Sequence, residues 1–291
     1  MKVDPEDIAK LAVGPRKIKG LIKDATFSTW EALLSDIIVG DSFGVDRIDY
    51  LLRDSHHAGV MYGKFDHYRL IDTLRILPKD KESNEPTLGI EDGGIHSAEA
   101  LLLARYFMFT QVYLHPVRRI YDIHLKDFLA NHLPGSKFSA DLATFLNTTD
   151  NNIINDLVTA AHTADGAASD AAIRIVNRTH FKVLYEKNPE DLLIFLDPGK
   201  VIYEAAIIEF GAESVRRDSY SKGAGAKEFP VRKKDGRIIS SLSASEALEK
   251  IPDATIDFIF IDPAKREKAI KWLKEKRLTI LRKAKEVVEE E

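Results

Sequence analysis

The sequence contains no cysteine, and this absence removes several kinds of site at once. Disulfides, thiolate zinc sites, iron–sulfur clusters and cysteine nucleophiles all need a residue that the chain lacks. No stretch approaches the roughly 18 apolar residues of a membrane-spanning helix. Residues 1–23 are charged throughout, unlike a secretory signal. We therefore expect a cytoplasmic protein with no membrane partner.

The chain also lacks an excess of positive charge. Lys and Arg number 42 against 46 Asp and Glu, which leaves a formal net charge of −4. Nothing global attracts nucleic acid or anionic lipid, so nucleic acid is not an expected partner. Basic residues do gather at Arg232, Lys233, Lys234 and Arg237, and this stretch favours a solvated loop over a phosphate contact.

Two motifs of metal and nucleotide enzymes are missing too. Among nine histidines there is no His-Asp dipeptide and no HExxH motif. His56 and His57 are adjacent, so on a helix they point about 100° apart and do not chelate one ion together. The glycine-rich residues 223–226 are not followed by the Gly-Lys-Ser/Thr of a phosphate-binding loop. The sequence therefore predicts neither a self-contained histidine metal site nor a glycine-rich nucleotide loop.

What the sequence does have is a globular composition, 44% hydrophobic and 30% charged, with helical periodicity over most of its length. The spacing of apolar residues predicts helices over 7–13, 29–39, 45–57, 139–162 and 167–177. A long helix is expected over 97–132, with Ser97 as its N-cap and a break at Pro116. The last helix is expected over 264–289, after the cap Asp262. Strands are expected at 68–77 and 87–90, as a hairpin, and at 191–197 and 255–262. Residues 204–210 fit either a helix or a strand, and residues 223–237 are expected to form a loop.

These elements predict a mainly α fold with a small β-hairpin, followed by a smaller α+β part. We expect the helical body over residues 1–185 and the α+β region, which ends in a long helix, over residues 186–291. Nothing in the sequence prevents the two from sharing one core.

The densest polar stretch is 44–57. On a helix Asp46, Tyr50 and Asp54 stand at i, i+4 and i+8 and share one face. One interpretation is a pocket wall, with a carboxylate for a metal and a phenol and second carboxylate for hydroxyl groups. The other is a solvated face on which Arg47 and Arg53 pair with nearby acids, and the pattern alone favours this second interpretation.

A second stretch places Arg105, Phe109 and Tyr113 on one helix face. A guanidinium offers a planar fork to phosphate oxygens, and an aromatic ring beside it suits a nucleotide. A helix whose aromatic residues simply belong to the core explains the same spacing, and it is again the simpler interpretation.

Residues 44–59 (GVDRIDYLLRDSHHAG) resemble a block found in the HD-domain dNTP triphosphohydrolases, the family of the SAM and HD domain protein and the bacterial dGTP triphosphohydrolases. The resemblance continues through FDHYRLI at 65–71, the hairpin, and the helix with Arg105. It returns at 146–153 and 175–186, and it is fainter at 256–266. In all it covers about residues 5–275, so it implies the later part of an HD-type helical body.

The resemblance also implies roles for individual residues. Asp46 matches a metal ligand of the family, and Arg47 matches a cation that touches the triphosphate. Tyr50 matches the tyrosine that packs on the sugar or phosphates, and Asp54 matches the carboxylate that reads the sugar 3′-hydroxyl. Arg105 matches a phosphate-binding arginine, and Tyr113 a further tyrosine near the sugar. Such enzymes use a divalent ion, Mg, Mn or Fe, to convert a dNTP into a deoxynucleoside and triphosphate.

Departures from the family pattern matter as much. The family's metal-binding His and His-Asp pair should precede the region that matches residues 1–20, and neither motif is found in this chain. A family histidine is Phe109 here, and a glutamine is Leu114. Because a lone Asp46 cannot hold a catalytic divalent ion, we expect no triphosphohydrolase activity from this chain alone.

Three explanations compete for this incomplete site. The chain is an N-terminally truncated form of an enzyme, which is the explanation we favour. Alternatively it is one half of a split enzyme whose partner chain supplies the missing helices, or a non-catalytic relative that binds a nucleotide or a regulatory partner. The resemblance also implies a homo-oligomer. Asp66 and Arg69 lie in a block that forms allosteric nucleotide sites in some relatives, although an ion pair at the hairpin is the simpler expectation.

Overall fold

The protein is described by a computed structural model that covers residues 4–15, 17–79, 85–163, 166–223 and 227–290. The chain forms two compact units, which we call the first and the second unit. The first unit comprises Met1–Val112 and Ser221–Ala254, and the second comprises Tyr113–Tyr220 and Thr255–Glu291. Each unit thus contains two separate pieces of chain. The predicted boundary lies at residue 185, whereas each compact unit contains residues from both sides of it. The domain assignment itself stays a prediction.

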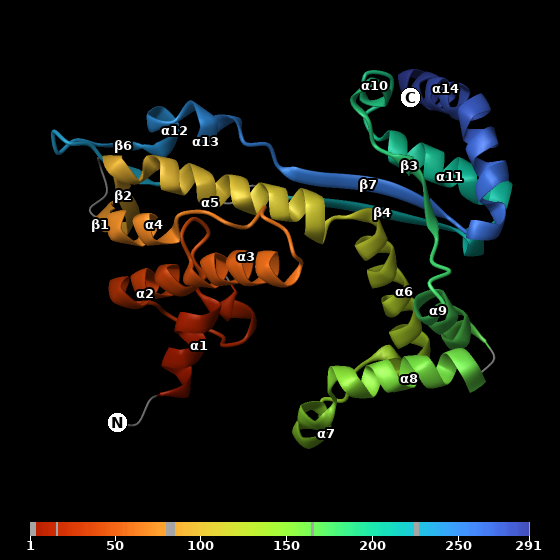
Figure 1. Cartoon of the computed structure of the whole chain (residues 1–291), viewed down its shortest axis with the longest axis horizontal. Helices are drawn as coiled ribbons and strands as arrows, with labels where there is room; N and C mark the ends of the chain where they lie inside the picture. The colour runs from red at the N-terminus through yellow and green to blue at the C-terminus, as the bar shows by residue number, and fades with distance from the viewer. Residues whose placement is uncertain (1–3, 16, 80–84, 164–165, 224–226, 291) are drawn as a thin grey trace. The chain divides into compact units, whose positions relative to one another are not determined.

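The first unit combines helices with a four-stranded sheet (Figure 1). Its main helices are α1 (Pro5–Val13), α2 (Thr29–Val39), α3 (Val45–His57), α4 (His67–Thr73) and α5 (Ile95–Met108), with the short α12 (Ser241–Ala244) and α13 (Glu246–Lys250). Its strands are β1 (Leu74–Pro78), β2 (Pro86–Glu91), β5 (Pro230–Arg232) and β6 (Ile238–Ser240), in the order β1-β2-β5-β6. The β1–β2 and β5–β6 pairs are antiparallel, and β2 runs parallel to β5.

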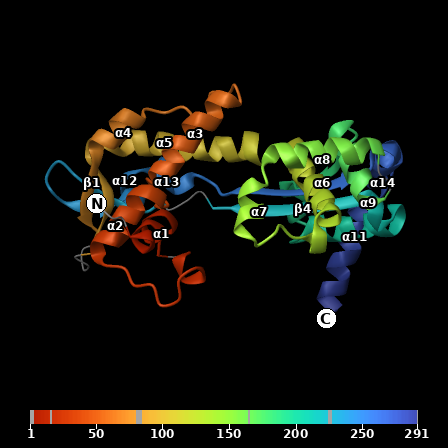
Figure 2. The ribbon, with the colours of Figure 1, turned by 90° about the horizontal axis from the view of Figure 1, so that it is seen from below.

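Local sequence explains how the first unit begins. The hydroxyl of Ser28 accepts the N–H of Glu31, whose carboxylate accepts the N–H of Ser28, so a capping box starts α2. Helix α3 spans the predicted residues and buries Ile48, Leu51 and Ser55, which stand at helical spacing on one face. Figure 2 shows α3 crossing close to α5, with which it makes direct contacts.

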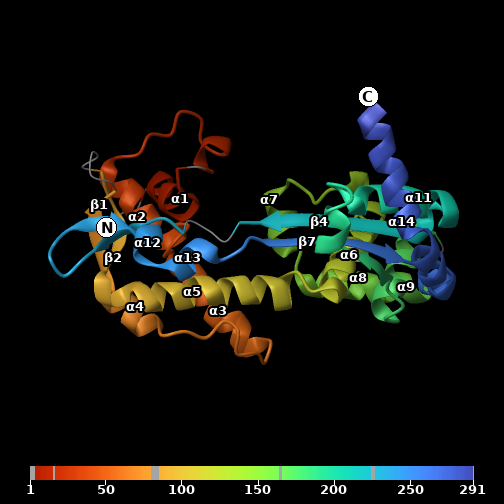
Figure 3. The same cartoon turned by 90° about the horizontal axis from the view of Figure 1, so that it is seen from above.

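The second unit packs helices around a three-stranded sheet. Its helices are α6 (Pro116–His132), α7 (Leu142–Asn147), α8 (Asp150–Thr163), α9 (Ala167–Val176), α10 (Pro189–Leu192), α11 (Pro198–Phe210) and α14 (Arg266–Glu290). Its sheet has the order β3-β7-β4, from β3 (Lys182–Glu186), β7 (Ala254–Ile261) and β4 (Val215–Lys222), and Figure 3 shows β4 and β7 side by side. Phe181, Phe258 and Phe260 belong to one of its apolar clusters. A π-helical turn, Phe109–Tyr113 (η3), lies at the boundary between the units.

The predicted fold class is confirmed: the chain is mainly helical, with a small hairpin and an α+β part. The hairpin, the strand at 255–262 and the helix boundary at Pro116 are also confirmed. The glycine-rich loop at 223–237 contains the short strand β5, while residues 224–226 lie outside the described residues. No helix in the described part of the chain is both long enough and apolar enough to cross a membrane.

Four local predictions were wrong, at residues 68–77, 97, 139–162 and 191–197. The first part of the expected strand 68–77 is helix α4, because Asp66 caps it by accepting the N–H of Arg69. Helix α5 begins at Ile95, so Ser97 is buried inside the helix and is not its cap. The single helix expected at 139–162 is divided into α7 and α8 by extended backbone at Thr148.

The apolar run 191–197 is not a strand. It contains the end of α10, a turn, and the residue Asp197, which caps α11 by accepting the N–H of Lys200. Pro198 occupies the first turn of α11, where its missing N–H costs nothing. The ambiguous residues 204–210 therefore belong to a helix.

Candidate functional site

The turn between α2 and α3 sets the position of the predicted site residues, and it requires glycine at both ends. A Cβ on Gly40 would lie 2.1 Å from the carbonyl oxygen of Asp36. A Cβ on Gly44 would lie 2.6 Å from the carbonyl oxygen of Gly40 and 2.7 Å from Oδ1 of Asp46. The backbone N–H of Gly44 donates to that same Gly40 oxygen at 3.1 Å. This close packing fixes where α3 begins.

Arg47 closes this turn from the helix side. Its guanidinium donates to the carbonyl oxygen of Gly40 and to Oδ1 of Asp41, the latter at 2.8 Å. The backbone N–H of Arg47 donates to Oδ1 of Asp46 at 2.7 Å. Asp46 itself is solvent-exposed at the first turn of α3, where the helix dipole favours a carboxylate. The turn therefore presents an acid and a cation side by side.

Arg105 brings a second guanidinium to the same region from α5. It is only 3% exposed, and its guanidinium carbon lies 5.8 Å from the ring centre of Phe109. Burial lowers the pKa of Arg105, and the charge of Arg47 lowers it further. The carboxylates of Asp41 and Asp46 act to raise the same pKa, so the two guanidinium groups share a region that contains charges of both signs.

Tyr50 lies next to both cations. Burial raises the pKa of the Tyr50 phenol, while the charges of Arg105 and Arg47 act against that rise. The phenol thus remains protonated at neutral pH and keeps its hydrogen-bonding capacity. Asp46, Arg47, Tyr50 and Arg105 form what we call the arginine cluster of the first unit.

The remaining predicted residues are placed differently. Asp54 lies two helical turns beyond Asp46 on α3, and its Oδ1 is 3.7 Å from Nε of Arg53. Arg53 also pairs with Asp49, so this end of α3 fits the solvated-face interpretation. Tyr113 belongs to the second unit, where its carbonyl oxygen accepts a hydrogen bond from Arg118 at 2.6 Å.

A divalent metal does not fit the described residues by themselves. No group of three or more His, Asp or Glu residues in the described ranges is arranged to hold an ion. The ring centres of His56 and His57 lie 5.3 Å apart at an angle of 74°, on the exposed end of α3. Asp46 can contribute one ligand, whereas a catalytic divalent ion needs several.

A cavity of about 1170 Å³ lies beside the arginine cluster, within the first unit. Asp46 and Arg47 form part of its wall, and α1, α2, the β1–β2 hairpin, β5, β6 and the loops next to them supply the rest. Ser35 lines the cavity and is only 1% exposed. Its hydroxyl has no hydrogen-bond partner among the described residues. Sequence spacing gave no signal for Ser35 or for Phe229 in this wall, because their proximity depends on tertiary packing.

Two further groups singled out in the sequence have structural roles. The Asp66 carboxylate caps α4, and the Arg69 guanidinium donates to the carbonyl oxygen of Gly93 at 3.2 Å. The two side chains therefore use these contacts in place of the expected ion pair. In the basic stretch, Arg232 pairs with Glu91, Lys233 with Asp92 and Arg237 with Asp235. These cations are largely balanced by neighbouring carboxylates.

Comparisons with known proteins give the following relationships. Residues 65–192 match a family model described as the HD associated region. The uncharacterized protein YwfO of Bacillus subtilis is 24% identical over 251 residues, covering 78% of this chain and 53% of YwfO. The uncharacterized protein MJ1154 of Methanocaldococcus jannaschii is 38% identical over 120 residues, covering 39% of this chain and 26% of MJ1154. The chain thus spans about half of one curated relative and about a quarter of the other.

Two solved structures share the fold. A hypothetical protein from Aquifex aeolicus has a TM-score of 0.71 at 33% identity, covering 85% of this chain and 61% of its own. A phosphohydrolase from Bacteroides thetaiotaomicron has a TM-score of 0.57 at 22% identity, covering 79% of this chain and 63% of its own. Most of this chain therefore has the fold of a large part of each of these longer proteins.

Proposed function

We propose that this chain supplies the phosphate-binding half of an HD-type phosphohydrolase site. The observation that carries the proposal is the arginine cluster, in which Arg47 and Arg105 converge beside Tyr50 and the exposed carboxylate of Asp46. Two guanidinium groups held close together favour a multiply charged anion such as a triphosphate. The match to the HD associated region and the fold shared with a phosphohydrolase support this assignment.

The proposed substrate is a dNTP, cleaved to a deoxynucleoside and inorganic triphosphate. In this proposal Arg47 and Arg105 contact the triphosphate, and Tyr50 packs against the sugar or phosphates. Asp54 accepts a hydrogen bond from the sugar 3′-hydroxyl. These roles follow the resemblance at residues 44–59 and 105–113.

In this proposal Asp46 is one metal ligand, and the family's His and His-Asp ligands come from outside the described residues. The described residues offer Asp46 without a matching set of histidines, so no hydrolytic step through a metal is derived for this chain alone. A longer polypeptide or a partner chain would supply the His and His-Asp ligands. The chain is then inactive by itself, and its assembly as a homo-oligomer stays a prediction.

The surface of α1 and α2 supports this arrangement. Ile8, Trp30, Leu34 and Ile37 are large apolar residues that are exposed on these two helices. They belong to the same two helices that line the cavity beside Asp46. Trp30, Leu34 and Ile37 recur at helical spacing, and a contiguous exposed apolar face suits an interface, so we propose that a completing segment packs there.

Nucleotide binding tests the first half of the proposal. Titration of the chain with dATP or dGTP in the presence of EDTA should raise its melting temperature, because a ligand that binds only the folded state stabilises it. Arg105→Gln should abolish the shift, whereas Arg237→Gln should retain it, because Arg237 is exposed and pairs with Asp235, outside the proposed site. Circular dichroism checks that both variants fold. Equal shifts in the two variants would contradict a binding role for the cluster.

Catalysis tests the second half. A longer polypeptide that contains the His and His-Asp motifs together with this sequence should release triphosphate from a dNTP in a metal-dependent manner. If it binds dNTP but shows no turnover with Mg²⁺, Mn²⁺ or Fe²⁺, the enzyme proposal fails.

The second candidate is a non-catalytic protein that binds a nucleotide and regulates a partner. The absence of a metal-binding cluster from the described residues favours it. Binding without turnover in the longer polypeptide is the outcome that this candidate predicts.

A further inference from the structure

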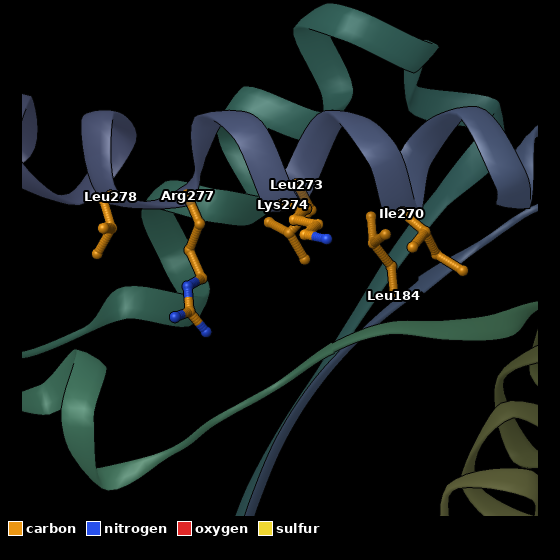
Figure 4. A pocket seen from close by; sticks show the side chains of 6 residues that line it. All are labelled: Leu184, Ile270, Leu273, Lys274, Arg277 and Leu278. Carbon is orange, nitrogen blue, oxygen red and sulfur yellow. The ribbon is translucent and has the colours of Figure 1, made fainter.

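The second unit contains a smaller cavity that the proposed function does not use. It has a volume of about 340 Å³ and lies between α14 and β3 (Figure 4). Four aliphatic and two basic side chains line it: Leu184, Ile270, Leu273, Lys274, Arg277 and Leu278. Five of them come from α14 and project from one side of that helix, as Figure 4 shows. Ile270 and Leu278 remain exposed to solvent, so part of the apolar lining is uncovered.

A buried carboxylate balances one of the two cations. Asp191 is 1% exposed, and its Oδ1 lies 3.7 Å from Nε of Arg277. Its Oδ2 accepts hydrogen bonds from the hydroxyl of Tyr185 and from Nδ2 of Asn188, each at 2.9 Å. The 3.7 Å separation is too long for a hydrogen bond, and Oδ1 has no donor among the described residues. The N–H groups of Arg277 therefore keep their capacity to bond a ligand.

Lys274 supplies the second positive charge. It is exposed one helical turn before Arg277, and it forms no ion pair within the described part of the chain. With Asp191 offsetting Arg277, the cavity carries about one unit of net positive charge. A single positive charge beside an apolar lining suits a ligand with one anionic group and an aliphatic body.

We infer that this cavity is a binding site for a small aliphatic monocarboxylate. The aliphatic body would lie against Leu184, Ile270 and Leu273, and the carboxylate would face Lys274 and Arg277. Its size lies at the lower end of small-molecule sites, which are mostly apolar with a few convergent polar groups. Arg is suited to carboxylates because its planar fork can donate two parallel hydrogen bonds.

The size and charge of the cavity set it apart from the arginine cluster. The arginine cluster belongs to the first unit, whereas this cavity belongs entirely to the second. A triphosphate carries several negative charges, which one net positive charge and the nearby Asp191 do not match. Failure of carboxylate binding would therefore leave the proposed nucleotide function untouched, and the reverse also holds.

Ligand-observed NMR with the full chain tests the site. Octanoate should show saturation transfer from the protein and bind with a dissociation constant in the millimolar range, on the order of small ligands with few polar contacts. Acetate, which lacks the aliphatic body, and octanol, which lacks the charge, should each bind at least about three-fold more weakly. Octanol that binds as tightly as octanoate would overturn the role given to the cations.

Two variants locate the bound ligand. Lys274→Gln should weaken octanoate binding about three-fold, which is the range expected for a solvent-exposed ion pair. Leu278→Glu should weaken it further, because it adds a negative charge and removes apolar contact. Lys276→Gln is the matched control, since Lys276 is exposed on α14 but does not line the cavity, and it should bind as the parent does. Equal affinity in all three variants would place octanoate elsewhere and overturn the inference.

Discussion

A buried histidine in the second unit gives the sharpest prediction about stability. His124 is 1% exposed on the inner face of α6, and its Nε2 accepts the backbone N–H of Phe181 at 3.2 Å. The same ring stands edge-on to the Phe181 ring, with centres 5.1 Å apart. Accepting that N–H requires an unprotonated Nε2, so protonation and the observed hydrogen bond exclude each other.

The surroundings of His124 also oppose a positive charge. Burial lowers the pKa of His124 to about 4, and the charges of Arg174, Arg216 and His180 act in the same direction. The charge of Asp262 acts against them, and Asp262 already pairs with Arg174 at 3.1 Å. The folded protein therefore prefers neutral His124 over most of the physiological range.

The direction of the pH effect follows from this lowered pKa. In the unfolded chain His124 takes up a proton near pH 6.5, whereas in the folded chain it does so only near pH 4. Above pH 6.5 both states are neutral and stability is unaffected. As the pH falls from 6.5 towards 4, His124 binds a proton in the unfolded state but not in the folded state, so the free energy of unfolding decreases. The loss is about 1 kcal/mol at pH 5.5 and about 3 kcal/mol in full.

Urea unfolding at pH 7.5 and pH 5.5 measures this loss. The chain has two tryptophans, and Trp30→Phe leaves Trp272, which packs against Phe210 with ring centres 5.3 Å apart, as the reporter of the second unit. In that background His124→Gln should reduce the pH-dependent loss by about 1 kcal/mol, because Gln stays neutral. His56→Gln, at an exposed position, should leave the loss unchanged. If His124→Gln has the same pH dependence as the parent, the histidine does not carry the effect and the reasoning is refuted.

Three other substitutions test local packing. Gly199→Ala places a Cβ 2.0 Å from Oδ2 of Asp257, so the free energy of unfolding in urea should fall by about 2–4 kcal/mol. An unchanged free energy of unfolding would mean that the Asp257 carboxylate moves aside freely. Asp66→Ala removes the cap of α4 and should cost about 1 kcal/mol in thermal unfolding, whereas Asp66→Asn, a good cap itself, should cost much less. Gly44→Ala should lower the free energy of unfolding by about 1–3 kcal/mol, because the new Cβ meets the carbonyl oxygen of Gly40. It should also weaken nucleotide binding measured by calorimetry, and unchanged affinity would mean that the turn does not position the binding site.

Sequence patterns predicted those elements whose ends carry strong local signals. Helix α3 lies between two glycines, Gly44 and Gly59, and its apolar spacing is regular, so its predicted and observed bounds agree. The start of the last helix was equally clear from Asp262 followed by Pro263, which the structure begins with a 3₁₀ turn. Both signals act within a few residues and do not depend on the rest of the fold.

The errors occurred where tertiary packing decides between similar patterns. The run 191–197 is apolar enough for a buried strand, yet Leu193 and Leu196 are among the most exposed large residues of the second unit. Asn188 and Asp197 instead cap two successive helices, and these caps outweigh the apolar composition between them. At 68–77 the cap Asp66 likewise determined helix where alternation suggested strand.

The site shows the same division between local and tertiary information. Spacing alone placed Asp46, Tyr50 and Asp54 on one helix face, but it did not distinguish a pocket wall from a solvated face. The two ends of α3 differ in their surroundings: Tyr50 near its start lies beside Arg47 and the buried Arg105, while Arg53 near its end pairs with two acids. That difference depends on Arg105, which α5 brings to only one end of α3.

The contacts of Arg47 have a consequence for how an anion would enter the arginine cluster. Its guanidinium is already bonded to Gly40 and Asp41, so a phosphate there must either share that fork or replace the carboxylate. Anion binding at Arg47 would therefore loosen the α2–α3 turn as its guanidinium changes partner. Because the same turn lines the cavity beside Asp46, anion binding and the packing of a completing segment would act on one structural element.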